Sequence, residues 1–162
     1  PPPVLSSAAS DVYKRQNEAR GTPWNPWDLS THRIPGGSSS GSGVATAAGM
    51  CAFAMGSDTG GSVRIPACLN GIFGHKTSVG LLPTDGVFPL SPTLDTLGPL
   101  TSNAADAAIL HAIMTGSDIP LATPLTGLRL GKPTSFFFED IDSRKNDGHD
   151  PHPRSRCWKV SE

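Results

Sequence analysis

The sequence predicts an α/β fold, and three segments carry that prediction. An apolar, alanine-rich segment follows a Gly/Ser loop at residues 36–43, the run FAMGSD at residues 53–58 has the composition of a short buried strand, and residues 102–116 have the pattern of a helix. Helices that alternate with strands over short connections are typical of α/β sheets. At 162 residues the chain is long enough for one domain.

The first helix is expected to begin at Ser40 or Ser42, because either hydroxyl can accept a hydrogen bond from the free N–H groups of a first helical turn. Its alanines and glycines have small side chains that allow close packing in an interior. We therefore expect this helix to run through about Ala54 and to be buried nearly all round.

The helix at residues 102–116 has well-marked ends. Asn103 and Asp106 have the spacing of a capping box, and Gly116 is a typical terminator. A further strand and a proline-marked turn are expected in GLRLGKPTSFFF at residues 127–138. The predicted apolar face of the helix consists of Ala105, Ala108, Ile109, Ala112 and Ile113.

The composition excludes several classes of function. The net charge is −1 and charged residues make up 17% of the chain, without a Lys/Arg run, so nothing favours a nucleic acid or an anionic membrane as partner. Cys51, Cys68 and Cys157 are an odd number without metal-ligand spacing, which is typical of buried thiols in a reducing compartment. The longest apolar stretch, residues 44–55, is too short to span a membrane, and no secretory leader opens the chain. We therefore expect a cytoplasmic protein.

The two ends of the chain differ in character from its middle. Residues 1–16 have no apolar periodicity, and DVYKRQ at residues 11–16 can be back-translated into the end sequence of a common transposon adapter, so we set this leader apart as non-native. A disordered native tail is the alternative. Residues 143–162 are polar and aperiodic, as expected of a disordered tail or of a frameshift near Asp142. The predicted domain comprises residues 17–142.

The Gly/Ser loop at residues 36–43 opens a helix, as a phosphate-binding loop does. However, the Walker lysine is absent, and the segment just upstream, NPWDLSTHRIP, is a proline-containing loop where a dinucleotide site needs a strand. A flexible linker is not expected either, because the loop leads directly into a dense apolar segment.

The second Gly-rich loop, SDTGGS at residues 57–62, has a clear chemical use. Because its glycines lack side chains, successive N–H groups can converge on one point and stabilise an oxyanion, and Ser62 can place its hydroxyl beside the same point. Asp58 and Arg64 flank the glycines and can pair across the turn to hold its shape. A Gly-rich turn with a capping serine fits this hexapeptide equally well.

Together the two loops resemble those of the amidase signature hydrolases. PGGSSSGSGVATAAG and GSDTGGSVRIPA stand in the order and spacing of that family, with Ser38 and Ser62 24 positions apart, and GIFGHKTSVGLLPTDG and SPTLDTLGPLTSNAADAA follow them. The resemblance covers about residues 25–142. It implies an α/β/α fold around a mixed central sheet, of which this chain carries a part.

The resemblance implies a Ser–Ser–Lys triad that acts on a small-molecule amide without a cofactor or a metal. It makes Ser62 the nucleophile and Ser38 the bridging serine, which follows a cis peptide bond from Gly37, with Asp58 and Arg64 as supports of the loop. The third member, a lysine, lies far upstream of the bridging serine in the family, and only 37 residues precede Ser38 here. The implied oxyanion hole consists of the N–H groups of Thr59, Gly60, Gly61 and Ser62.

Neither candidate lysine matches the missing base. Lys14 lies in the leader, and Lys76, in GHKTSVG, matches a structural position of the family. The resemblance therefore implies an incomplete catalytic apparatus and an inactive chain. Asp95, in SPTLDTLGP, matches a family position whose role is packing and turn formation near the site, and we do not expect it to be catalytic.

The histidines and large aromatic residues are expected to be structural. None of the three histidines of the middle of the chain has an acidic partner at a spacing that would favour a Ser–His triad, and His149, His152 and Cys157 are not expected to bind a metal. The structural histidines are His32, His75 and His111, and the expected core or loop anchors are Trp24, Trp27 and Phe53.

We expect the complete protein to hydrolyse a carboxamide to an acid and ammonia or an amine through an acyl-enzyme. The glutaminase subunit of a tRNA-dependent amidotransferase, which uses the same triad, is the alternative within the family. A non-catalytic binding or structural protein is the alternative from another class. The sequence leaves the substrate and the oligomeric state open.

Overall fold

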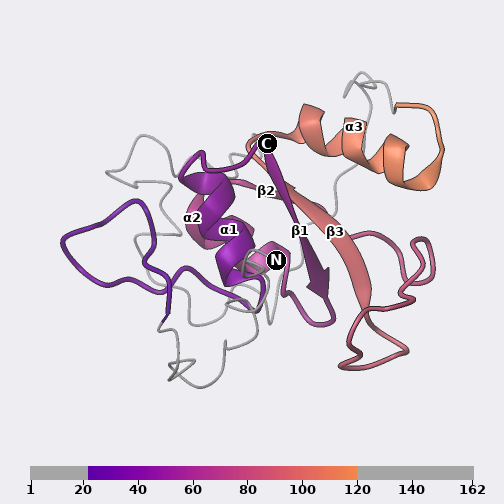
Figure 1. Ribbon diagram of the computed structural model, residues 1–162, viewed down its shortest axis with the longest axis horizontal. Helices are drawn as coiled ribbons and strands as arrows, with labels where there is room; N and C mark the ends of the chain where they lie inside the picture. The colour runs from indigo at the N-terminus through magenta and orange to yellow at the C-terminus, as the bar shows by residue number, and fades with distance from the viewer. Residues whose placement is uncertain (1–21, 120–162) are drawn as a thin grey trace, which may run out of the picture. The chain divides into compact units, whose positions relative to one another are not determined.

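The computed structural model describes residues 22–119, all of which belong to one unit of the chain (Figure 1). Helices and strands are mixed along it, so the α/β class is confirmed. No helix of this part is long and apolar enough to cross a membrane. The elements are α1 (Ser40–Ala47), β1 (Phe53–Asp58), α2 (Arg64–Asn70), β2 (Phe73–Gly74), β3 (Thr96–Thr101) and α3 (Ala104–Thr115).

The three strands of residues 22–119 form one sheet in the order β1-β3-β2. β1 pairs with β3 along its whole length, ending with Asp58 opposite Thr96. The short β2 pairs with the other side of β3, with Gly74 opposite Leu100. The resemblance implied a mixed sheet, but both strand pairs within residues 22–119 are antiparallel.

Successive side chains of a strand point to opposite sides, which defines two faces of the sheet. Gly74 lies so close to α2 that an added Cβ would stand 2.6 Å from the Cβ of Ala67, and its neighbour Leu100 belongs to the same core cluster as Ala67. We call this side the α2 face. Phe73 and His75 point the other way and line a pocket with residues of α3, so that side is the α3 face. Figure 1 shows α1 and α2 next to each other beside the strands, and α3 beyond the opposite side of the sheet.

α1 is shorter than predicted, because it ends at Ala47 and not near Ala54. Gly49 adopts a left-handed conformation with φ +69°, which turns the chain out of the helix and toward β1. The N-cap is Ser39, whose side chain makes no capping hydrogen bond, and the Ser42 hydroxyl donates instead to a main-chain carbonyl of β1 at 2.7 Å. The predicted burial is confirmed for six of the eight residues of the helix.

β1 coincides with the predicted strand FAMGSD, but it is not buried as predicted. Phe53 and Met55 lie on the α3 face and are 46% and 40% exposed. The sequence did not predict α2, β2 or β3. Pro66 lies in the first turn of α2 and Pro99 in the middle of the central strand β3, and proline is unfavourable in a central strand because it cannot donate a ladder hydrogen bond.

α3 has the predicted ends. The Asn103 side chain accepts a hydrogen bond from the Asp106 N–H at 2.9 Å, and Gly116 ends the helix with φ +67°. The predicted face is wrong for Ala105, which is exposed, and for Ile109 and Ile113, which are 43% and 71% exposed. α3 packs on the sheet through other small residues, among them Ala107 and Ala108. The strand predicted at 127–138 lies outside the described residues.

Candidate functional site

The loop that carries Ser38 is held against α2. Gly36 has φ +78°, and an added Cβ would stand 2.9 Å from the backbone of α2, so only glycine fits there. The buried Asn70, at the end of α2, donates from Nδ2 to the carbonyl of Pro35 at 2.6 Å. The Gly37–Ser38 peptide bond is cis, as the resemblance implied.

A second anchor stands upstream of this loop. The indole Nε1 of Trp27 donates to the carbonyl of Asn70 at 2.6 Å, and the Asn25 side chain donates to the carbonyl of Leu69 at 2.7 Å. Trp24 stacks on His32 with ring centroids 4.9 Å apart. Trp24 and Trp27 therefore act as loop anchors, as predicted.

The two serine loops meet through their main chains. The N–H of Ser39 donates to the carbonyl oxygen of Ser62 at 3.1 Å, so the residue after Ser38 is hydrogen-bonded to the predicted nucleophile. Ser39 also packs directly on Gly56 of β1, where a larger residue would collide with its side chain. Ser38 and Ser62 are both half-buried. The structure thus brings together two loops that are 24 positions apart.

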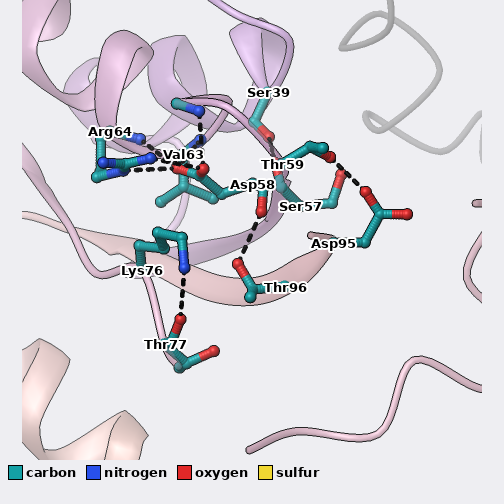
Figure 2. Close-up of polar contacts among 11 residues, drawn as sticks. Ser39, Ser57, Asp58, Thr59, Val63, Arg64, Lys76, Thr77, Asp95 and Thr96 are labelled. Atoms are coloured by element: carbon teal, nitrogen blue, oxygen red, sulfur yellow. Dashed lines mark hydrogen bonds and ion pairs between the residues drawn. The ribbon is translucent and has the colours of Figure 1, made fainter. Parts of the chain in front are cut away.

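The Asp58 carboxylate organises the second half of the SDTGGS loop. It is fully buried and accepts hydrogen bonds from the N–H groups of Gly61, Val63 and Arg64 at 2.8–3.3 Å. The Arg64 guanidinium adds two charge-assisted hydrogen bonds at 3.0 Å, so the predicted pairing across the turn is confirmed (Figure 2). Burial acts to raise the pKa of Asp58, but these donors outweigh it and hold the pKa below its ordinary value.

These bonds change the set of donors that can face an oxyanion. The Gly61 N–H donates to Asp58 at 2.8 Å, so it does not point freely into the site as the resemblance implied. The N–H groups of Thr59, Gly60 and Ser62 have no acceptor within residues 22–119. Gly60 is also open to solvent, since an added Cβ would meet nothing within 4 Å. Three of the four expected donors therefore remain available on the loop.

Thr96, the first residue of β3, and Asp95, just before it, contact the first half of the loop. Asp95 accepts a hydrogen bond from the hydroxyl of Thr59, and the hydroxyl of Thr96 donates to the carbonyl of Asp58 at 2.8 Å. Asp95 was expected to have a packing role, and Thr96 was not singled out, because β3 was not predicted. The available signal was a polar Asp-Thr pair directly before the apolar run LGPL.

Lys76, the lysine expected to be structural, makes its hydrogen bond to the main chain and not to a serine. Lys76 is the one lysine within residues 22–119, and its Nζ donates to the carbonyl of Thr77 at 2.9 Å. Lys14 lies outside the described residues. Within residues 22–119 no hydrogen bond joins Lys76 to Ser38 or Ser62.

The remaining candidates make structural contacts. Nε2 of His75 and Nδ1 of His111 are 3.1 Å apart and share a hydrogen bond. Within residues 22–119 no three metal-ligating side chains form a group that could hold a metal ion, and His149, His152 and Cys157 lie outside this part. Cys51 is half-buried but Cys68 is exposed on α2, so the expectation of buried thiols is wrong for Cys68.

Known proteins resemble this chain over most of its length. The Amidase family matches residues 7–139, a range that begins inside the leader. The chain is 47% identical to 2-amino-5-chloromuconic acid deaminase of Comamonas testosteroni, over 75% of the chain and 27% of that protein. It is 43% identical to indoleacetamide hydrolase of Agrobacterium vitis, over 78% of the chain and 27% of that protein.

A solved structure extends the resemblance to the fold. The crystal structure of one subunit of the glutamyl-tRNA(Gln) amidotransferase from Thermotoga maritima matches with a TM-score of 0.57 and 50% sequence identity, covering 62% of this chain and 22% of that one. The chain thus spans about a quarter of the length of the relatives it matches.

Proposed function

Because the chain belongs to the amidase signature family, we propose that residues 17–142 are part of an amidohydrolase in which Ser62 is the nucleophile and Ser38 carries its proton. The substrate is a small molecule with a carboxamide group, and the products are a carboxylic acid and ammonia or an amine. In the complete protein the described sheet is part of a larger α/β/α domain with a mixed sheet.

One observation carries this proposal: the hydrogen bond from the Ser39 N–H to the Ser62 carbonyl. It joins the two serine loops directly beside the two hydroxyl-bearing residues. A Gly-rich turn with a capping serine, the alternative for the second loop, gives no reason for a second serine loop to be anchored on it. The buried Asp58 supports the proposal further, because it fixes the turn after Gly60 from inside.

The proposed reaction proceeds in two stages through an acyl-enzyme. The Ser62 oxygen attacks the amide carbonyl carbon while its proton passes through Ser38 to a base, and the carbonyl electrons move onto the oxygen. The N–H groups of Thr59, Gly60 and Ser62 stabilise this oxyanion. Collapse of the tetrahedral intermediate expels the amine with the returned proton, and water then releases the acid from the acyl-enzyme.

The base in this proposal is a lysine supplied by sequence outside the 162 residues. A lysine that is desolvated loses part of its preference for the charged form, so its pKa can fall from ~10.4 toward ~7–8 and its neutral amine can accept a proton. Lys76 does not take this role, because its Nζ is engaged by the Thr77 carbonyl.

The test uses the complete protein that carries these residues. A fluorophosphonate is expected to add to Ser62, and mass spectrometry of the labelled peptide locates the adduct. Hydrolysis is measured as ammonia release from a panel of primary carboxamides with aromatic, acidic and aminoacyl groups. Ser62→Ala is expected to abolish labelling and to lower kcat by more than about 10⁴-fold, because it removes the nucleophile.

The control is Ser78→Ala, which removes an exposed hydroxyl from the loop between β2 and β3 and is expected to keep both readouts at the wild-type level. Labelling that persists in Ser62→Ala would reject this nucleophile. A wild-type protein that neither reacts with the probe nor releases ammonia from any amide would favour the non-catalytic alternative.

A glutaminase subunit of an amidotransferase is a second candidate, and the 50% identity to the amidotransferase chain of Thermotoga maritima favours it. This function uses the same serines, with glutamine as the amide and a partner protein as the recipient of ammonia. It predicts that glutamine is the best amide of the panel and that the partner protein accelerates its hydrolysis. Faster hydrolysis of an aromatic amide than of glutamine would reject it.

A further inference from the structure

The peptide unit between Asp58 and Thr59 carries the first available donor of the loop, and its orientation is set from the opposite side. The Thr96 hydroxyl donates to the Asp58 carbonyl at 2.8 Å, and Thr96 is buried. This peptide is trans and planar, so its N–H points away from its own carbonyl. A hydrogen bond that holds the carbonyl toward β3 therefore holds the Thr59 N–H away from β3.

The side chain of Thr59 is held by Asp95. Oδ1 of Asp95 accepts from the Thr59 hydroxyl, while Oδ2 accepts from the N–H groups of Leu90 and Ser91, both at 2.9 Å. The hydrogen bond from Thr59 leads the interactions that keep the pKa of Asp95 below its ordinary value. An ionised carboxylate can accept all three bonds at once, whereas a neutral amide has one acceptor oxygen.

Asp95 and Asp58 contact different parts of the loop. The Asp58 carboxylate accepts from three N–H groups that follow Gly60, those of Gly61, Val63 and Arg64, and makes no contact with the Thr59 N–H. Figure 2 shows Arg64 and Asp95 at opposite ends of this group, with Thr96 pointing at the Asp58 carbonyl between them. The direction of the Thr59 N–H is therefore determined by the start of β3 and not by the loop alone.

We propose that Asp95 and Thr96 are positioning residues that aim the Thr59 N–H at the oxyanion, Thr96 by fixing the Asp58–Thr59 peptide plane and Asp95 by fixing the Thr59 side chain. This inference rests on the proposed amidohydrolase function. Neither residue touches the substrate. Their effect falls on a hydrogen bond that strengthens as the oxyanion forms, so they act on kcat and not on substrate binding.

The experiment measures kcat and KM of the complete protein with its best amide, for Asp95→Asn and Thr96→Val. Loss of one oxyanion donor lowers kcat by about 10²–10³-fold, and a donor that is present but misaligned is expected to lower it by about 10- to 100-fold with KM nearly unchanged. The rate of fluorophosphonate labelling at Ser62 should fall in parallel. The matched control is Asp85→Asn, an exposed aspartate of the same connecting loop, which is expected to keep kcat.

A double-mutant cycle separates positioning from general loosening. If Asp95 acts through the Thr59 hydroxyl, Asp95→Asn lowers kcat in the wild-type background but adds little in a Thr59→Val background. The amide proton signal of Thr59 in a ¹H–¹⁵N spectrum should move in Asp95→Asn and in Thr96→Val and stay in place in Asp85→Asn. Because Thr96 is buried, its variant can fail to fold, and Asp95→Asn then carries the test.

The outcomes are distinct. A reactive wild-type protein whose Asp95→Asn variant keeps the wild-type kcat and labelling rate overturns the inference and leaves the proposed function intact. Additive losses in the cycle overturn the route through Thr59. A wild-type protein that neither labels nor hydrolyses amides rejects the proposed function and this inference with it.

Discussion

The two faces of the sheet are built in different ways. On the α2 face, Leu100 is fully buried, Gly74 and Gly56 bring helices and loops into direct contact with the strands, and Asp58 lies buried under its own turn. On the α3 face, Phe53 and other large side chains of the strands are about half exposed, and the helix meets the sheet across an apolar pocket.

The difference shows what fixes a loop in place. The α2 face is specified by close backbone approach at glycines and by side chains that bond to main-chain groups, and both allow little adjustment. The α3 face depends on a helix with good local signals at its ends but few buried contacts. The loops of the candidate catalytic serines lie on the α2 face, where N–H groups such as those of Ser39, Gly61 and Val63 are fixed by hydrogen bonds.

Removal of the buried Asp58 carboxylate is expected to have the largest effect on the α2 face. Asp58→Ala leaves the N–H groups of Gly61 and Val63 without their acceptor and the Arg64 guanidinium without its partner. A buried N–H group that loses its acceptor costs about 1–3 kcal/mol, whereas the Arg64 side chain is 52% exposed and can be solvated. We expect a loss of this order for each of the two N–H groups in the free energy of unfolding, measured by urea denaturation.

Asp85→Ala is the control, because Asp85 is exposed, and it should leave the urea midpoint unchanged. Arg64→Met should have a smaller effect than Asp58→Ala, since the Arg64 side chain is 52% exposed and the buried carboxylate keeps its three N–H donors. A larger loss for Arg64→Met would mean that the ion pair, and not the main-chain contacts, holds the loop.

A second test compares a buried apolar side chain of the α2 face with an exposed apolar side chain of α3. Leu100→Ala is expected to lower the free energy of unfolding by about 2–5 kcal/mol, because it leaves a cavity beside Val63 and Ala67. Ile113→Ala on α3 is expected to change it by less than about 0.5 kcal/mol, since the side chain is mostly exposed. Equal losses in the complete protein would show that another part of the chain covers α3.

The elements that the sequence predicted are those with local signals. α3 has a capping asparagine and a terminal glycine, and β1 is a short apolar run, so both lie where they were expected. β3 contains Pro99, and it forms only because tertiary contacts outweigh an unfavourable local preference, whereas Pro66 is tolerated in the first turn of the short α2. α1 ends earlier than the sequence predicts, because Gly49, in a left-handed conformation, turns the chain out of the helix.

The candidate site shows the same division. The pairing of Asp58 with Arg64 was predicted, because the two residues lie only six positions apart, on either side of a glycine turn. The use of the Gly61 amide by Asp58 could not be predicted, because it depends on which way one peptide unit points. Thr96 was not recognised as a contact of the loop, since its register opposite Asp58 exists only once β3 pairs with β1.

The smallest predicted effect concerns the α3 face and its pair of histidines. His75 and His111 share one hydrogen bond, which requires one ring to donate and the other to accept. Burial lowers the pKa of His75 below its ordinary value of 6.5, and the charge of His111 lowers it further. Because the unfolded chain binds this proton more readily, the contribution to stability is complete above pH 6.5 and is lost as the pH falls through the lower pKa of the folded state.

Urea denaturation between about pH 8 and pH 5 measures how the free energy of unfolding changes with pH. Asp58 does not contribute to the change in this range, because its lowered pKa confines its contribution to lower pH. His75→Gln should flatten the profile relative to the wild type, whereas His32→Gln, at an exposed ring stacked on Trp24, should not. Parallel profiles for the wild type and His75→Gln would mean that His75 titrates alike in the folded and unfolded chains. The α3 face would then contribute no pH-dependent contact, and its difference from the α2 face would be one of packing alone.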